Sequence, residues 1–154
     1  MPFTIINGDI TKIKTDAVVN AANSALKKGG GVCGAIFDAA GADKLQAQCD
    51  AIGHCEVGEA VITNGFALPA KFIIHTVGPL WLGGRNGEER LLSLCYQNSL
   101  ALAEKHGLTS IAFPLISSGI FGYPREEART VAETAISEFL KKHEMEVFLV
   151  LFNQ

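Results

Sequence analysis

The sequence predicts an α/β fold: a three-layer α/β/α sandwich with a central mixed six-stranded sheet. Short β-rich runs alternate with helical patterns along the whole chain. Some of these runs are apolar on both faces, which is typical of strands covered by helices on both sides of a sheet. The first run is short and compatible with antiparallel pairing, which favours a mixed sheet over a purely parallel one.

Six segments are expected to form the strands: 3–7, 17–20, 60–64, 72–77, 110–113 and 146–152. Four helices are expected at 34–40, 43–51, 88–105 and 125–142. The last helix has the strongest pattern, because small and apolar residues recur in it at helical spacing. Pro124 stands just before its first turn, where Glu126 and Glu127 complement the helix dipole.

Length and composition narrow the class of protein. The 154 residues fit one domain spanning 1–154, and a net charge of −3 argues against a protein that binds nucleic-acid backbones. Neither a signal peptide nor a membrane span is predicted. The four cysteines form no C-x-x-C pair, so we expect reduced thiols, no metal site and a cytoplasmic location.

A glycine-rich segment follows the second expected strand. It reads N-A-A-N-S at 20–24 and G-G-G-V-C-G at 29–34. Glycines before a helix offer backbone N–H groups and the positive end of a helix dipole, which can bind a phosphate without Lys or Arg. The spacing matches neither a dinucleotide fingerprint nor a P-loop, so a flexible turn is the alternative.

Two further segments carry candidate ligand groups. The run P-L-I-S-S-G-I-F-G-Y-P at 114–124 combines hydroxyls, glycines and an aromatic ring before a helix, and is either a second anion site or a polar connection. In N-G-D-I-T at 7–11, Asp9 either accepts a hydrogen bond from an amine such as that of adenine or caps a turn. Both glycine-rich segments should lie at the carboxyl edge of the sheet, where such folds bind ligands.

Together these motifs resemble one family. The chain contains I-x-x-G-D-I-T, V-V-N-A-A-N-S, G-G-G-V-x-G-A-I, A-A-G, V-G-E-A, L-P-A-K-F-I-I-H-T-V-G-P and S-x-G-I-F-G-Y-P, in this order, from about residue 4 to residue 152. With them it closely resembles the macro domains, and within them the MacroD-type group. The resemblance implies the macro domain fold and an ADP-ribose ligand bound at one edge of the sheet.

The resemblance also implies the ligand contacts. Asp9 would hold the adenine amine beside the Ile10 backbone, and Asn23 would contact the distal ribose. The first phosphate loop would consist of Gly30, Gly31 and Val32. The second would consist of Ser117, Ser118, Gly119, Ile120, Phe121 and Gly122, with Phe121 also on the distal ribose. Phe152 would lie against adenine, the alternative being a place in the strand core.

MacroD-type enzymes remove ADP-ribose from modified protein side chains or deacetylate O-acetyl-ADP-ribose, and they need no metal or other cofactor. For this chain the modified side chains are expected to be acidic. The implied partners are ADP-ribose, related small molecules and mono-ADP-ribosylated proteins, bound by a monomer. The sequence departs from the group at Cys33, where an Asp is usual, and at Phe37, where a His is usual.

A neutral thiol is a poor general base. Cys33 is therefore either apolar filler or a functional replacement for the usual Asp. The candidate catalytic residues are Asn20, Asn23 and Cys33, with the phosphate of the ligand orienting the attacking water. The competing function is a reader module that binds ADP-ribose without cleaving it. His75 is expected to be a hydrogen-bonded core histidine, and Trp81 with 83–87 a mobile loop beside the cleft.

Overall fold

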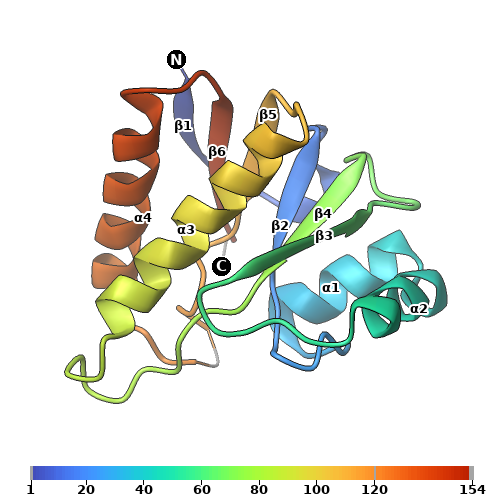
Figure 1. Cartoon of the computed structure of the whole chain (residues 1–154), viewed down its shortest axis with the longest axis horizontal. Helices are drawn as coiled ribbons and strands as arrows, with labels where there is room; N and C mark the ends of the chain where they lie inside the picture. The colour runs from blue at the N-terminus through green and yellow to red at the C-terminus, as the bar shows by residue number, and fades with distance from the viewer. Residues whose placement is uncertain (1, 120, 153–154) are drawn as a thin grey trace.

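The computed structural model describes residues 2–119 and 121–152 and shows a three-layer α/β/α sandwich (Figure 1). Its sheet has six strands: β1 (Phe3–Asn7), β2 (Ala17–Ala21), β3 (Ala60–Asn64), β4 (Phe72–Thr76), β5 (Ser110–Phe113) and β6 (Glu146–Leu151). The strand order is β1-β6-β5-β2-β4-β3. The predicted fold class and mixed six-stranded sheet are therefore confirmed.

The antiparallel strand is β3, not the first strand as the sequence suggested. β1 runs parallel to β6, with Phe3 opposite Val147 and Asn7 opposite Leu151. β3 instead pairs antiparallel with β4. The short connection 65–71 explains this difference, because parallel neighbours need a crossover of a dozen or more residues.

Helices cover both faces of the sheet. They are α1 (Gly31–Ala40), α2 (Ala42–Ile52), α3 (Glu88–Lys105) and α4 (Arg125–Leu140), and a short 3-10 turn, η1 (Ile10–Lys12), follows β1. Figure 1 shows α3 and α4 on one face and α1 and α2 on the other. α1 begins three residues earlier than expected, which places Cys33 and Gly34 in its first turn. None of the described helices is long and apolar enough to cross a membrane.

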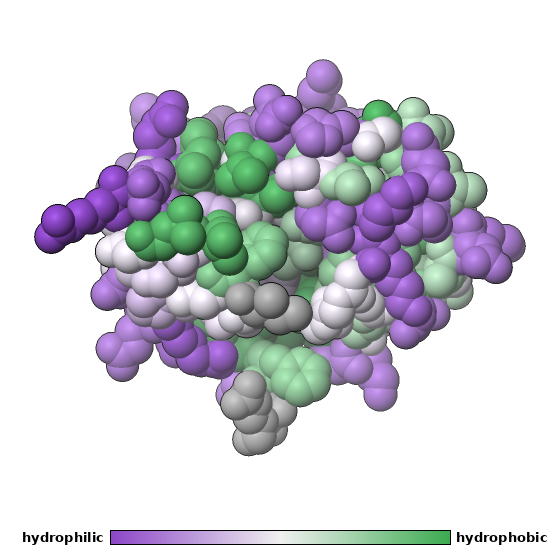
Figure 2. Space-filling view, turned by 90° about the horizontal axis from the view of Figure 1, so that it is seen from below, coloured by the Kyte–Doolittle hydropathy of each residue, from purple (hydrophilic) through white to green (hydrophobic). Residues whose placement is uncertain are grey.

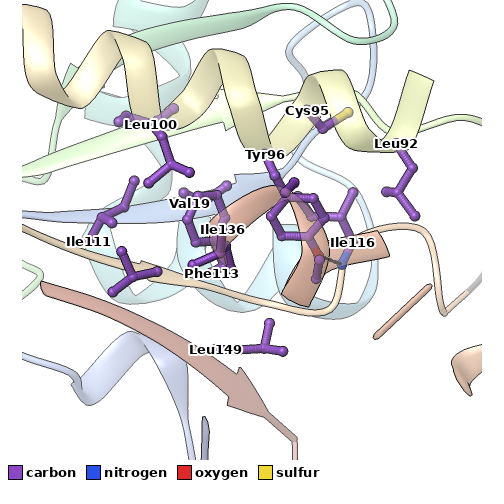
Figure 3. Packing of buried hydrophobic residues seen from close by; sticks show 14 of the residues in the cluster. Val19, Leu92, Cys95, Tyr96, Leu100, Ile111, Phe113, Ile116, Ile136 and Leu149 are labelled. Atoms are coloured by element: carbon purple, nitrogen blue, oxygen red, sulfur yellow. Dashed lines mark hydrogen bonds between the residues drawn. The ribbon is translucent and has the colours of Figure 1, made fainter. Parts of the chain in front are cut away.

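Alternate residues of the strands supply the two cores. Val19 of β2 packs in the cluster under α3 and α4, whereas its neighbour Val18 belongs to the cluster under α1 and α2. In the first cluster, the rings of Tyr96 and Phe113 lie 5.0 Å apart between α3 and the sheet (Figure 3). The Tyr96 hydroxyl donates to the Pro114 carbonyl and accepts from the Ile116 N–H, at 3.3 and 3.1 Å. The core thus fixes the start of the segment that follows β5.

Candidate functional site

A cleft of about 190 Å³ lies at the carboxyl ends of β2, β4 and β5. Its lining comes from three connections that follow these strands: Ala21, Ala22, Asn23, Gly29, Gly30, Gly31, Val32, Cys33, Gly78, Pro114, Leu115, Ile116, Ser117, Gly119 and Phe121. Figure 2 looks onto this edge of the molecule, where most of the strongly hydrophilic residues stand toward the periphery. The two glycine-rich segments therefore meet at the sheet edge that the sequence predicted.

The described part of the lining contains no charged side chain. An anion would therefore depend on backbone N–H groups. Gly30 caps α1 without a side-chain hydrogen bond, and the Gly34 N–H is the first to bond back into the helix, to Gly30 O at 3.3 Å. The N–H groups of Gly31, Val32 and Cys33 have no intrahelical acceptor, and the positive end of the helix dipole adds to their attraction for an anion.

Two glycines allow close approaches around the cleft. A Cβ on Gly34 would lie 2.5 Å from the Gly29 carbonyl oxygen, so only glycine lets the loop fold back on the first turn of α1. A Cβ on Gly78 would lie 2.7 Å from Ile116 Cγ2 and would overlap the Ser117 hydroxyl. Gly78 thus brings the end of β4 against the segment that follows β5.

The segment after β5 holds a strained serine. Ser117 has φ +67°, a left-handed conformation that costs a non-glycine residue about 1–2 kcal/mol. Its hydroxyl is buried and finds no partner among the described residues. The Tyr123 N–H donates to Ser117 O at 2.9 Å and the Gly122 N–H to Gly119 O at 3.0 Å, which holds the strained turn in place. Backbone strain and an orphaned hydroxyl in one cleft residue are typical of a functional site.

A chain of hydrogen bonds runs from the sheet to the cleft wall. Asn20 Nδ2 lies 3.0 Å from His75 Nδ1 and donates to Cys33 Sγ at 3.7 Å. Because the amide donates to Nδ1, the imidazole carries its proton on Nε2, which lies 2.9 Å from Thr63 Oγ1. Burial lowers the pKa of His75 to about 4, so the ring is neutral. The prediction of a hydrogen-bonded core histidine is confirmed.

Cys33 forms part of the cleft wall. Its thiol donates to the Lys27 carbonyl at 3.7 Å and accepts from the Asn20 amide at 3.7 Å. Asn20 is fully buried behind Cys33 and does not line the cleft. Phe37 lies deeper still, with its ring edge-on to His75 at a centroid distance of 6.5 Å. The two departures from the MacroD-type pattern thus differ, because one is at the cleft and the other is in the core.

Asn23 lines the cleft and also fixes its own loop. Its Oδ1 accepts from the Lys27 N–H at 3.0 Å and its Nδ2 donates to Lys27 O at 2.8 Å. Gln46 of α2 holds the same loop by accepting from the Lys28 N–H and donating to Leu26 O. The first glycine-rich segment is therefore a loop braced by side-chain hydrogen bonds from Asn23 and Gln46.

Asp9 and Phe152 lie beyond the cleft, at the β1–β6 end of the sheet. Asp9 Oδ1 caps η1 by accepting from the Thr11 N–H and hydroxyl, at 2.9 and 2.7 Å, and the Thr11 hydroxyl bond chiefly lowers the Asp9 pKa. Phe152 follows β6, and its side chain is 63% exposed. The alternative prediction, that Phe152 belongs to the strand core, is therefore wrong. The Gly8 N–H donates to Leu151 O at 3.0 Å, which holds the two segments side by side.

The structure brings together eight of the predicted site residues: Asn23, Gly30, Gly31, Val32, Cys33, Ser117, Gly119 and Phe121. Six others lie outside the lining: Asp9, Ile10, Asn20, Ser118, Gly122 and Phe152. The predicted contact of Ile120 falls outside the described residues. Sequence reasoning missed Gly78 as a lining residue, although a glycine directly after a buried strand signals a close backbone approach.

The fold and cleft define a class: α/β domains with an uncharged, glycine-lined cleft and a helix N-terminus at the carboxyl edge of a mixed sheet. A model of the macro domain family matches residues 19–132. A macro domain-containing protein of Methanosarcina mazei is 51% identical over 152 residues, which cover 97% of this chain and 81% of that protein. The chain belongs to the macro domain family.

Two further comparisons concern proteins whose names state a ligand or an activity. A protein of Citrobacter rodentium named O-acetyl-ADP-ribose deacetylase is 52% identical over 142 residues, covering 90% of this chain and 80% of that protein. The Oceanobacillus iheyensis macrodomain, solved with ADP, superposes with a TM-score of 0.90 at 44% identity, covering 97% of this chain and 82% of the other.

Proposed function

We propose that this single domain binds ADP-ribose in the cleft and hydrolyses ADP-ribose esters. The observation that carries the proposal is the uncharged cleft in which the N-terminus of α1, with its free N–H groups, and a second glycine-rich loop meet. Hydrogen bonds from N–H groups to a charged acceptor contribute about 1.5–3 kcal/mol each. Four or five such bonds, less the cost of association, give micromolar affinity, or about −8 kcal/mol.

The ligand would lie along the edge of the sheet. Its pyrophosphate would rest between Gly30–Val32 and the loop 117–122. Adenine would lie at the β1–β6 end, where Asp9 Oδ2 is left to accept its amine and Phe152 offers an exposed ring. The distal ribose would lie beside Asn23 and Phe121.

The reaction is the addition of water across an ester. Hydrolysis of an acidic side-chain ester gives ADP-ribose and the free carboxylate, and O-acetyl-ADP-ribose gives ADP-ribose and acetate. The described lining offers no carboxylate or imidazole as a base. The water would therefore be oriented by the ligand phosphate, with Asn23 and the second loop holding the distal ribose and Asn20 acting through Cys33.

A reader that binds ADP-ribose without cleaving it is the second candidate. The uncharged lining favours this candidate as well. General-base catalysis typically raises a reaction rate by a factor of about 10²–10⁴, and the described lining offers no base to supply it. Cys33 is the position where the two candidates separate, since an Asp there would face both the cleft and the Asn20 amide.

The test is release of ADP-ribose from a glutamate-linked mono-ADP-ribosylated protein by the native chain, Cys33→Asp and the uncharged control Cys33→Asn. Turnover by the native chain supports the hydrolase. Tight binding without turnover, with activity gained in Cys33→Asp but not in Cys33→Asn, would make the native protein a reader.

A further inference from the structure

The strand order sets the direction in which a bound ligand runs. Asp9 follows β1, the second loop follows β5 and Asn23 follows β2, so adenine, pyrophosphate and distal ribose would succeed one another along the order β1-β6-β5-β2-β4-β3. The next element in this direction is the connection after β4, which reaches the cleft at Gly78. A group attached to the distal ribose would therefore extend toward this connection.

The connection 79–87 is tied to the cleft. The Trp81 N–H donates to the Phe121 carbonyl at 2.9 Å, and the Trp81 ring packs on Tyr123 with centroids 4.6 Å apart. Gly84 lies against the same ring, where a Cβ would be 2.7 Å from it. Trp81 thus joins the connection to the second glycine-rich loop.

A buried carboxylate braces the same connection. Glu88 is 2% exposed and accepts from the N–H groups of Leu82, Gly84 and Asn86, at 2.9, 3.0 and 2.7 Å. Desolvation opposes the charge, but these bonds outweigh it and lower the Glu88 pKa to about 2. The loop that the sequence predicted to be mobile is therefore held by an ionised side chain beneath it.

This braced loop presents two leucines to solvent. Leu80 is 53% and Leu82 is 64% exposed, while Trp81 between them points inward. The two leucines thus flank the inward-facing Trp81 in one braced loop. Exposed leucines held in place beside a ligand cleft offer apolar area that a bound partner could bury.

We propose that Leu80 and Leu82 form a docking surface for the protein substrate and contact an apolar side chain next to its ADP-ribosylated residue. This inference rests on the proposed function, since it needs ADP-ribose in the cleft with its distal ribose toward β4. It names the substrate class: a protein segment rather than O-acetyl-ADP-ribose, whose acetyl group ends close to the ribose.

The experiment uses two peptides that carry ADP-ribose through a stable oxime linkage, one with Leu and one with Ser on each side of the modified residue. Affinities for both peptides and for free ADP-ribose are measured by calorimetry. The native protein should bind the Leu peptide about tenfold more tightly than the Ser peptide, the gain expected for partial burial of two leucines. The double variant Leu80→Ser/Leu82→Ser should lose this preference and keep its affinity for free ADP-ribose.

Phe66→Ser is the matched control, because Phe66 is 38% exposed in the β3–β4 connection at the opposite edge of the sheet. It should behave as the native protein does. Equal affinity of the native protein for both peptides would overturn the docking surface and leave the proposed function intact. Failure of the native protein to bind free ADP-ribose would overturn both.

Discussion

Replacement of Ser117 by glycine should make the protein more stable while leaving its fold unchanged. The left-handed backbone at Ser117 costs about 1–2 kcal/mol that glycine does not incur. The variant also removes a buried hydroxyl without a described partner, a group whose desolvation costs about 1–3 kcal/mol. Against these gains stands the extra chain entropy of glycine in the unfolded state, about 0.5–1 kcal/mol.

The net gain should be about 1–4 kcal/mol, and each kcal/mol gained should raise Tm by about 2–4 °C in a domain of this size. Thermal and urea unfolding measure it directly. Ser118→Gly is the control: Ser118 donates to Leu115 O at 2.9 Å and has no left-handed backbone, so this variant should lose stability. An unchanged or lower Tm for Ser117→Gly would refute the assignment of strain to this residue.

Three further predictions concern the walls of the cleft and the histidine behind it. Gly34→Ala should lose about 1–3 kcal/mol of stability, because the new Cβ meets the Gly29 carbonyl. The control Gly8→Ala, which has open space around its Cβ, should lose little. Urea unfolding compares the two variants. The pKa of His75 is about 4 when folded and about 6.5 when unfolded, so stability should fall by about 3 kcal/mol as the pH drops from 6.5 to 4. Between these two pH values the unfolded chain holds a proton on His75 that the folded chain does not. His75→Gln should remove this part of the pH dependence of the unfolding free energy. An unaltered pH dependence would contradict the neutral buried ring. Iodoacetamide should alkylate Cys33 first, because burial raises the pKa of Cys49, Cys55 and Cys95 to about 11 and none of those three lines the cleft. Mass spectrometry should show slower labelling with ADP-ribose present, and a first adduct elsewhere would contradict the placement of Cys33.

Local patterns in the sequence were enough to predict the strands and helices. The bounds of β1, β3, β5 and α3 agree with the predicted segments, because each is flanked by turn or capping residues. The pairing direction of β1 was missed, since its partner β6 lies at the other end of the chain and local periodicity carries no information about a distant neighbour.

The candidate site was predictable where glycines mark backbone contacts, and less so where side chains from distant segments meet. The position of Asn20 behind Cys33 depends on His75, which is 55 residues away in sequence. Glu88 stands in the first turn of α3, a common place for an acid, but the fold of the preceding loop makes it a buried acceptor of three N–H groups. Such roles follow from tertiary contacts and not from residue type.

The most direct test of the account is calorimetric titration of ADP-ribose into the native protein and Gly119→Glu, with Gly119→Gln as the uncharged control. Gly119 lines the cleft, and no described atom lies within 4 Å of its Cβ position, so the new side chain should leave the fold intact. A carboxylate about 5 Å from a phosphate charge costs about 3 kcal/mol at an effective dielectric constant of 20. The account predicts micromolar binding by the native protein and at least about a hundredfold loss in Gly119→Glu, greater than in Gly119→Gln. No binding by the native protein, or equal affinity in Gly119→Glu, would contradict it.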